Sequence, residues 1–161
     1  MKKLFSLVIL GILISTCNSD RVPVESPKKT VNAFLEKYHK AFNNKDINTI
    51  ESMLADNGLY CGTNSKQLLV KDSLLNMLNR LFADTSINTS YQVYKREIKL
   101  TNDGKAAVAM EQFTIHAFSQ NIPMRFISHI HKHKKDWKFD FGNYSYVPND
   151  AGFIKQNKAL E

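Results

Sequence analysis

The sequence predicts an α+β domain in which helices pack on one face of a curved antiparallel sheet. In the first half of the chain the apolar residues recur every three or four positions, as they do in amphipathic helices. In the second half they fall in four long β-rich runs separated by turn-forming residues, as in an antiparallel meander. A length of 161 residues fits one such domain.

The N-terminus has the pattern of an export signal. Lys2 and Lys3 precede an apolar run over residues 4–14, which as a helix would reach only ~16 Å, about half of a bilayer's hydrocarbon core. Residues 13–17 read Leu-Ile-Ser-Thr-Cys, which resembles the lipobox of bacterial lipoproteins. The resemblance implies a signal peptide over residues 1–16 and a lipid on Cys17. The alternative is a secreted protein in which Cys17 only lies near the cleavage point.

A lipidated Cys17 would place the domain outside the cytoplasm. Several acyl chains on one cysteine bury enough methylene groups, at ~0.8 kcal/mol each, to hold a soluble domain on a membrane. Residues 17–26 are polar with one internal proline, which is typical of a flexible tether. We therefore expect a lipid-anchored protein of the bacterial cell envelope, facing the periplasm or the cell surface.

Charge and cysteine content exclude several functions. The net charge of +7 comes from scattered Lys and Arg residues without a base-reading basic stripe, so nucleic acid is not an expected partner. A mildly basic exported protein is attracted to anionic envelope lipids or polymers. No glycine-rich phosphate loop occurs, and we expect no cofactor. Cys61 lies in an apolar stretch without an adjacent His or Asp, which favours a core residue over a nucleophile.

Three helices are expected at the start of the domain, which we place at residues 27–148. Ser26 can cap the first helix, and Pro27 suits its first position. Asp46 can cap a second helix, which the turn residues 56–58 would end. A third helix is expected over residues 71–83. The apolar positions that define these helices are Val31, Phe34, Leu35, Tyr38, Ala41, Phe42, Ile47, Ile50, Met53, Leu54, Leu74, Leu75, Met77, Leu78, Leu81 and Phe82.

One short and four long strands are expected to form the sheet. The short strand covers residues 59–61. The long ones are separated by turn chemistry at 102–104, 120–123 and 135–136. If this sheet is strongly curved, it leaves a cavity between its concave face and the helices. The long strands cover residues 91–100, 106–118, 124–134 and 137–147, and residues 149–161 are expected to be a C-terminal tail.

Several phrases of the sequence resemble one family. They are residues 33–35 and 41–47, residues 53–56, residues 58–64 with Lys71, and the last strand at 137–145. Together they resemble nuclear transport factor two-like proteins of the SnoaL-like branch over most of residues 28–147. The resemblance implies a cone-shaped α+β barrel, often a homodimer through the sheet, with a pocket at its wide end. Its members include cyclases, isomerases, dehydratases and proteins without chemistry, so the fold does not select an activity.

The last strand supplies most of the predicted pocket. Strict alternation places every second residue from Trp137 on one face, and the resemblance makes that face the concave one. In many relatives an ionisable residue takes the place of Asn143, whose amide cannot act as a general base near neutral pH. The alternative is that Asn143 and the tyrosines line a closed core. The predicted lining is Tyr38, Phe42, Tyr60, Trp137, Phe139, Phe141, Asn143 and Ser145.

Three histidines at a spacing of two form the other pattern with chemical meaning. His129, His131 and His133 share one face of a strand, with neighbours ~6.5–7 Å apart. If residues 135–136 form a two-residue turn, His131 lies opposite Asp140, which makes His129, His131 and Asp140 a weak candidate metal site. Their face has the opposite parity to Trp137, so we interpret them as a polar outer surface with a His–Asp hydrogen bond, and we assign no metal.

No catalytic residue can be assigned from the sequence. Glu111 and His116 lie five residues apart, which places them on opposite faces of a strand. His39 borders the apolar stripe of the first helix, as boundary residues do.

These observations favour an envelope lipoprotein whose domain binds a small, partly apolar ligand or a protein partner without catalysis. The first alternative is an enzyme of the isomerase, cyclase or dehydratase type, with an ionisable residue in the cavity. The second is a homodimeric structural or assembly protein, whose cavity is filled by its own side chains.

Overall fold

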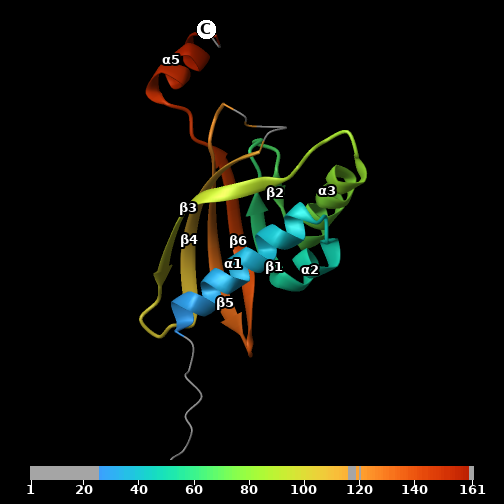
Figure 1. Cartoon of the computed structure of the whole chain (residues 1–161), viewed down its shortest axis with the longest axis vertical. Coiled ribbons are helices and arrows are strands. Elements are labelled where there is room, and N and C mark those ends of the chain that lie inside the picture. The colour runs from blue at the N-terminus through green and yellow to red at the C-terminus, as the bar shows by residue number, and fades with distance from the viewer. Residues whose placement is uncertain (1–25, 116–118, 120, 160–161) are drawn as a thin grey trace, which may run out of the picture.

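In the part of the chain that it describes, the structure has a six-stranded sheet with three helices on one face and a further helix beyond its end (Figure 1). It is a computed structural model that describes residues 26–115, 119 and 121–159. The strand order is β2-β1-β6-β5-β4-β3. The predicted α+β class is therefore confirmed. The predicted signal peptide, Cys17, the tether up to residue 25, and His116 lie outside the described residues.

The three predicted helices are present. Helix α1 (Pro27–Asn43) begins at the expected cap, where the Ser26 side chain accepts a hydrogen bond from the Lys29 amide. Helix α2 (Ile47–Met53) is capped by Asp46, which accepts from the Thr49 amide at 3.0 Å. Helix α3 covers Lys71–Ala83. The helices bury their apolar faces against the sheet, and α1 contributes Val31, Leu35, Tyr38, His39, Ala41 and Phe42.

The first strand is longer than predicted. Strand β1 covers Leu54–Cys61 and includes residues 56–58, which we expected to end the second helix as a turn. Its pairing with β6 is parallel and shifts register between Leu54 and Leu59, so an irregularity in the strand accommodates the turn-forming residues. A further short strand, β2 (Leu68–Leu69), pairs with the end of β1. The sheet thus has six strands instead of the expected five.

The four long strands form the predicted antiparallel meander. They are β3 (Tyr91–Leu100), β4 (Ala106–Ile115), β5 (Met124–His133) and β6 (Asp136–Tyr146). The turn before β6 is not at residues 135–136, because His133 pairs with Asp136 and leaves Lys134 and Lys135 in the turn. Lys134 adopts a φ of 56°, the left-handed conformation that such tight turns use.

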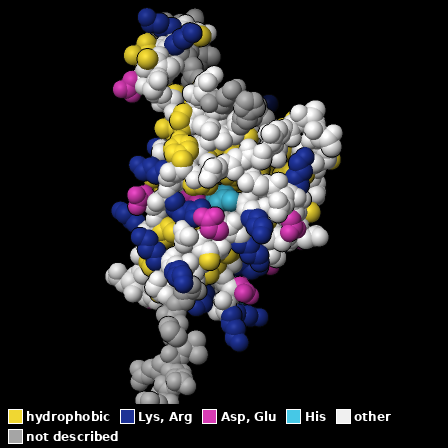
Figure 2. Space-filling model, viewed as in Figure 1, with side chains coloured by type: hydrophobic (Ala, Val, Ile, Leu, Met, Phe, Trp, Pro, Cys, Tyr) yellow, Lys and Arg dark blue, Asp and Glu magenta, His cyan; other side chains and the backbone are white. Residues whose placement is uncertain are grey.

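Helix α5 (Asp150–Lys158) forms within the segment that we assigned to a C-terminal tail. It projects away from the sheet beyond the end of β6 (Figure 1), and hydrophobic side chains are exposed on it at the top of Figure 2. None of the helices in the described part of the chain has the length and apolarity needed to cross a bilayer.

A bulge in β6 changes which of its residues face the helices. Ile130 pairs with Phe139 and His129 pairs with Phe141, so Asp140 is an extra residue between two regular pairs. Before the bulge the odd-numbered residues of β6 point toward the helices, and after it the even-numbered ones do. This shift of phase decides the composition of the site described next.

Candidate ligand-binding cavity

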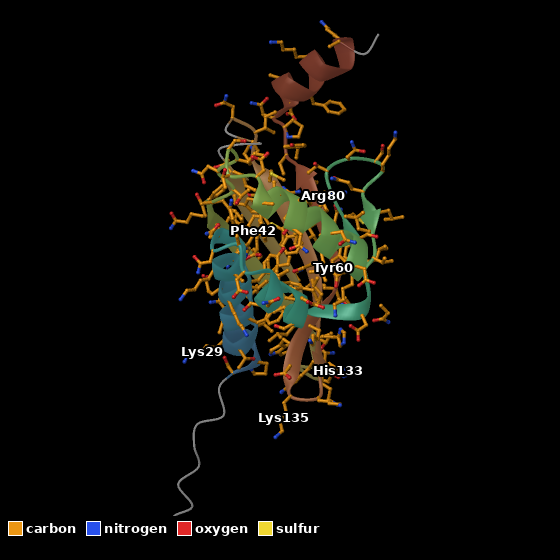
Figure 3. The ribbon with its side chains drawn as sticks, turned by 90° about the vertical axis from the view of Figure 1, so that its right-hand side faces the viewer. Lys29, Phe42, Tyr60, Arg80, His133 and Lys135 are labelled. Atoms are coloured by element: carbon orange, nitrogen blue, oxygen red, sulfur yellow. The ribbon has the colours of Figure 1, made fainter. Side chains whose placement is uncertain are left out.

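A cavity of about 370 Å³ lies between the inner face of the sheet and helices α1 and α3. Its wall is mainly aliphatic and aromatic, and α3 supplies Leu74, Met77, Leu78 and Leu81. Figure 3 labels Phe42 from α1 and Tyr60 from β1, two of the lining residues. The strands contribute Leu54, Tyr60, Ile115, Met124, Phe126, Phe139, Gly142, Tyr144 and Tyr146, while Cys61, Gly62, Thr63, Gln67 and Leu69 line it from the end of β1 through β2.

Half of the predicted lining residues border this cavity and half do not. Tyr38, Phe42, Tyr60 and Phe139 line it. Trp137 is also on the inner side, but near the start of α1, where its indole Nε1 donates to the Thr30 hydroxyl at 3.2 Å. Placing Phe141, Asn143 and Ser145 in the cavity was wrong, because the bulge at Asp140 turns all three to the outer face. Gly142, Tyr144 and Tyr146 line the cavity in their place.

The polar groups of the cavity are mainly tyrosine hydroxyls. The hydroxyls of Tyr38 and Tyr144 lie 2.8 Å apart and share one hydrogen bond. Two phenols hold two protons and use one in that bond, so the second proton can be donated to a ligand oxygen. The Tyr60 hydroxyl donates its proton to the Phe139 carbonyl at 2.9 Å, so that proton is not available to a ligand.

These hydroxyls are protonated donors near neutral pH, as tyrosines ordinarily are, and burial extends that state to higher pH. Burial raises the pKa of Tyr38 to about 12, although its hydrogen bond with Tyr144 acts in the opposite direction. Burial likewise raises the pKa of Tyr144 and Tyr60 well above the ordinary value. Tyr91, beside this group, has a raised pKa for the same reason. Near neutral pH the cavity therefore offers neutral hydroxyls instead of phenolate bases.

The raised tyrosine pKa values predict a loss of stability at high pH. An unfolded tyrosine ionises near pH 10, whereas these four stay protonated in the folded chain. Above about pH 10 the folded state therefore binds more protons than the unfolded state. The contribution of these tyrosines to the free energy of unfolding is fully present below about pH 10 and falls as the pH rises further. We expect four of the six tyrosines to show no phenolate absorbance at about pH 11 until urea unfolds the chain. Titration of all six near pH 10 in the folded protein would contradict this.

A second polar cluster is buried between α1 and the strands β3 and β4. The His39 ring lies between two partners, with Nδ1 2.7 Å from the Tyr91 hydroxyl and Nε2 2.8 Å from Glu111 Oε2. Arg96 Nε donates to Glu111 Oε1 at 2.5 Å, and Arg96 Nη1 donates to Glu36 at the surface. His39 and Arg96 border a surface hollow between α1 and β3 and are not among the lining residues of the apolar cavity.

The sequence analysis missed this cluster. It placed His39 at a boundary, yet the side chain is buried. The signal that could have found it is Glu111, which interrupts the apolar alternation Ala107, Ala109, Phe113 on the inner face of β4. A carboxylate at such a position needs a buried partner, although nothing in the sequence shows that α1 supplies it.

The histidines of β5 lie on the outer face of the sheet, as interpreted from their parity. His129 Nδ1 is 2.6 Å from Asp140 Oδ1, and His131 Nδ1 is 3.1 Å from Asp140 Oδ2 without hydrogen-bond geometry. The predicted pairing was wrong, because His131 faces Lys138 and Asp140 reaches both rings from the bulge. Within the described residues, no three His, Cys, Asp or Glu side chains are arranged to hold a metal ion.

Comparison with known proteins gives a family and a fold. Residues 31–150 match the family model of the SnoaL-like domain. No curated protein matches the chain at a significant level.

Solved structures with the same fold share little sequence with the chain. An NTF2-like protein of unknown function from Pseudomonas putida KT2440 has a TM-score of 0.66 at 11% identity, over 77% of this chain and 89% of that one. A cystatin-like fold protein from Burkholderia xenovorans LB400 has a TM-score of 0.65 at 12% identity, over 78% and 95%. A candidate scytalone dehydratase from Novosphingobium aromaticivorans has a TM-score of 0.64 at 9% identity, over 75% and 84%.

Proposed function

Because the chain belongs to the SnoaL-like domain family and a fold alone does not select an activity, we propose from its own cavity that it binds a small, largely apolar molecule without catalysis. One observation carries the proposal: the described residues that line the cavity include no Asp, Glu, His, Lys or Arg. Its volume of about 370 Å³ lies within the range of small-molecule sites.

The chemistry of the wall defines the class of ligand. Aliphatic side chains of α3 face aromatic rings of the sheet, where Phe126 and Tyr144 stack with their centroids 4.3 Å apart. The Tyr38–Tyr144 pair can donate one proton to an acceptor. A flat or aliphatic molecule with one carbonyl or hydroxyl oxygen suits this lining. Among the lining residues that the structure describes, none carries a carboxylate or an imidazole that could take a proton from it.

The proposal includes attachment to a membrane. The lysine pair, the apolar run over residues 4–14 and the lipobox-like residues 13–17 support a lipid on Cys17 and a location in the bacterial cell envelope. A homodimer through the outer face of the sheet is also proposed. Val108, 46% exposed, and Leu59, 39% exposed, lie on that face and support it.

Native mass spectrometry of the protein extracted from membranes tests these parts together. We expect a mass that includes acyl groups on Cys17, and we expect each particle to contain two copies of the protein. We also expect a bound small molecule that is lost when the protein unfolds. An empty cavity that also fails to bind any apolar probe would contradict the proposal. A small molecule that the wild-type protein converts chemically would favour the enzyme alternative.

The tyrosine pair is expected to orient a carbonyl ligand. The probe is prodan, a naphthalene dye with one ketone, whose emission shifts to the blue in apolar surroundings. In the double variant Tyr38→Phe/Tyr144→Phe, prodan should bind about 5–10-fold more weakly, the effect of one hydrogen bond. The analogue 2-dimethylaminonaphthalene, which has no ketone, should bind both proteins equally.

The matched control is Tyr94→Phe, because that side chain is 58% exposed and does not line the cavity. It should leave the affinity for prodan unchanged. Equal prodan affinities of the wild type and the double variant would show that the pair does not contact the ketone.

A further inference from the structure

One end of the domain carries a cluster of exposed lysines from three separate segments. Lys28 and Lys29 belong to the first turn of α1, and Lys105 to the turn between β3 and β4. The remaining three lie at the turn between β5 and β6. We call this surface the basic end and define it as Lys28, Lys29, Lys105, Lys132, Lys134 and Lys135.

One backbone hydrogen bond and one close packing contact hold the three segments together. The Lys132 amide donates to the Lys105 carbonyl at 2.8 Å, which joins the two turns. Gly104 lies against Pro27, since a Cβ on that glycine would be 3.3 Å from the proline ring. Figure 3 shows Lys29 and Lys135 at the same end of the molecule. The cluster is therefore part of the folded surface.

The basic end has a large surplus of positive charge. Its three segments contain six lysines and two carboxylates, Asp103 and Asp136, which leaves a surplus of four positive charges. The segments are residues 26–30, 101–106 and 132–137. The Asp103 carboxylate accepts hydrogen bonds from the Thr101 hydroxyl and the Lys105 amide, which lower its pKa. Both donors belong to the same turn as Asp103. Figure 2 shows several Lys and Arg side chains on the lower part of the visible face.

We propose that the basic end docks on the anionic phospholipid surface of the membrane that holds the lipid anchor, a proposal whose orientation rests on the proposed attachment at Cys17. Eight residues separate Cys17 from Ser26, so the nine Cα–Cα steps between them span at most ~30 Å. That tether enters the domain at the basic end. Each lysine close to such a surface raises the affinity for it about fivefold.

Docking in this orientation turns the cavity away from the bilayer. Strand β6 runs from Asp136 at the basic end to Tyr146 at the cavity, and β4 runs from Ala106 to Ile115 in the same sense. The ends of the strands that line the cavity thus lie farthest from the membrane. The cavity would then lie on the aqueous side of the domain.

The single tryptophan provides a reporter at the correct place. Trp137 lies at the basic end, with Lys132 Nζ 6.0 Å from the centre of its ring. We would reconstitute the membrane-extracted protein in vesicles with dansyl-labelled headgroups and measure energy transfer from Trp137. One set contains phosphatidylcholine alone, and in the other about one third of the lipid is phosphatidylglycerol, whose charge supplies the attraction.

Energy transfer should be greater on the anionic vesicles and should fall to the neutral level in about 1 M salt, where charges are screened beyond ~3 Å. The variant Lys134→Gln/Lys135→Gln should lower the ratio of docked to undocked protein roughly 25-fold. The matched control, Lys155→Gln/Lys158→Gln in α5 at the opposite end, should behave as the wild type (Figure 1).

Equal energy transfer on the two kinds of vesicle, or an equal loss in the α5 control, would overturn the docking proposal. The mass of the same preparation decides the attachment separately. A chain without acyl groups that still sediments with anionic vesicles through Lys134 and Lys135 would keep the docking surface and reject the anchor. An acylated protein that shows the same energy transfer on neutral and anionic vesicles would support the anchor and contradict the docking surface.

Discussion

Replacing Glu111 with alanine is expected to lower the free energy of unfolding by about 3–5 kcal/mol, the range found when one member of a buried charge pair is removed. The Glu111 side chain is 0% exposed and holds both Arg96 and His39. Burial opposes the charge of Arg96, but the carboxylates of Glu111 and Glu36 outweigh it and raise the pKa of the guanidinium above its ordinary value. Without Glu111, a largely buried cation keeps one acidic partner, Glu36, at the surface.

Urea unfolding of the variants measures this effect, and the structure offers a matched control. Glu36 contacts the same guanidinium, yet its side chain is 64% exposed, so Glu36→Ala should change the unfolding free energy by no more than about 1 kcal/mol. Glu111→Gln keeps the shape of the side chain and one hydrogen-bond acceptor. Its loss of unfolding free energy should lie between those of Glu36→Ala and Glu111→Ala. Similar values for Glu36→Ala and Glu111→Ala would show that burial does not decide the strength of this network.

The periodicity of the sequence was sufficient to predict most of the fold. Helices α1 and α3 and the four long strands lie close to where the apolar pattern places them, because that pattern records which side of each element is buried. Residues 56–58 were misinterpreted, since the pairing of β1 with a strand about eighty residues later overrides their preference for a turn. Helix α5 has weak amphipathic character, so its sequence contained little signal.

The candidate site was harder to predict than the fold, because one residue changed it. Alternation along β6 was followed correctly from Trp137 to Phe139, but nothing local marks Asp140 as the bulge. A single extra residue exchanges the two faces of everything after it, which moved Asn143 out of the cavity and Tyr144 into it. The pair formed by Tyr144 and Tyr38 follows from this bulge and could not be inferred from spacing.

Gly142→Leu should abolish binding of prodan, with a loss of affinity of more than about 100-fold. Gly142 faces the cavity after the bulge, and a Cβ there would lie 2.9 Å from Phe126 Cε2 and 3.4 Å from Tyr60 Cδ1. A leucine must therefore displace the Phe126 ring, which stacks on Tyr144, and occupy space that the ligand needs. Overpacking of this kind costs about 1–3 kcal/mol of stability, so the measurement includes the urea midpoint.

The neighbouring variant Asn143→Leu is the decisive control, because it adds a side chain of the same kind one position later. Asn143 pairs with Ile127 on the outer face and does not line the cavity, so its replacement should leave prodan binding unchanged. If Gly142→Leu fails to fold, Gly142→Ala adds only the Cβ and should weaken binding to a lesser degree. Loss of binding in Asn143→Leu but not in the Gly142 variants would mean that β6 alternates without a bulge. The cavity would then end in an amide, and the tyrosine pair would not form its polar wall.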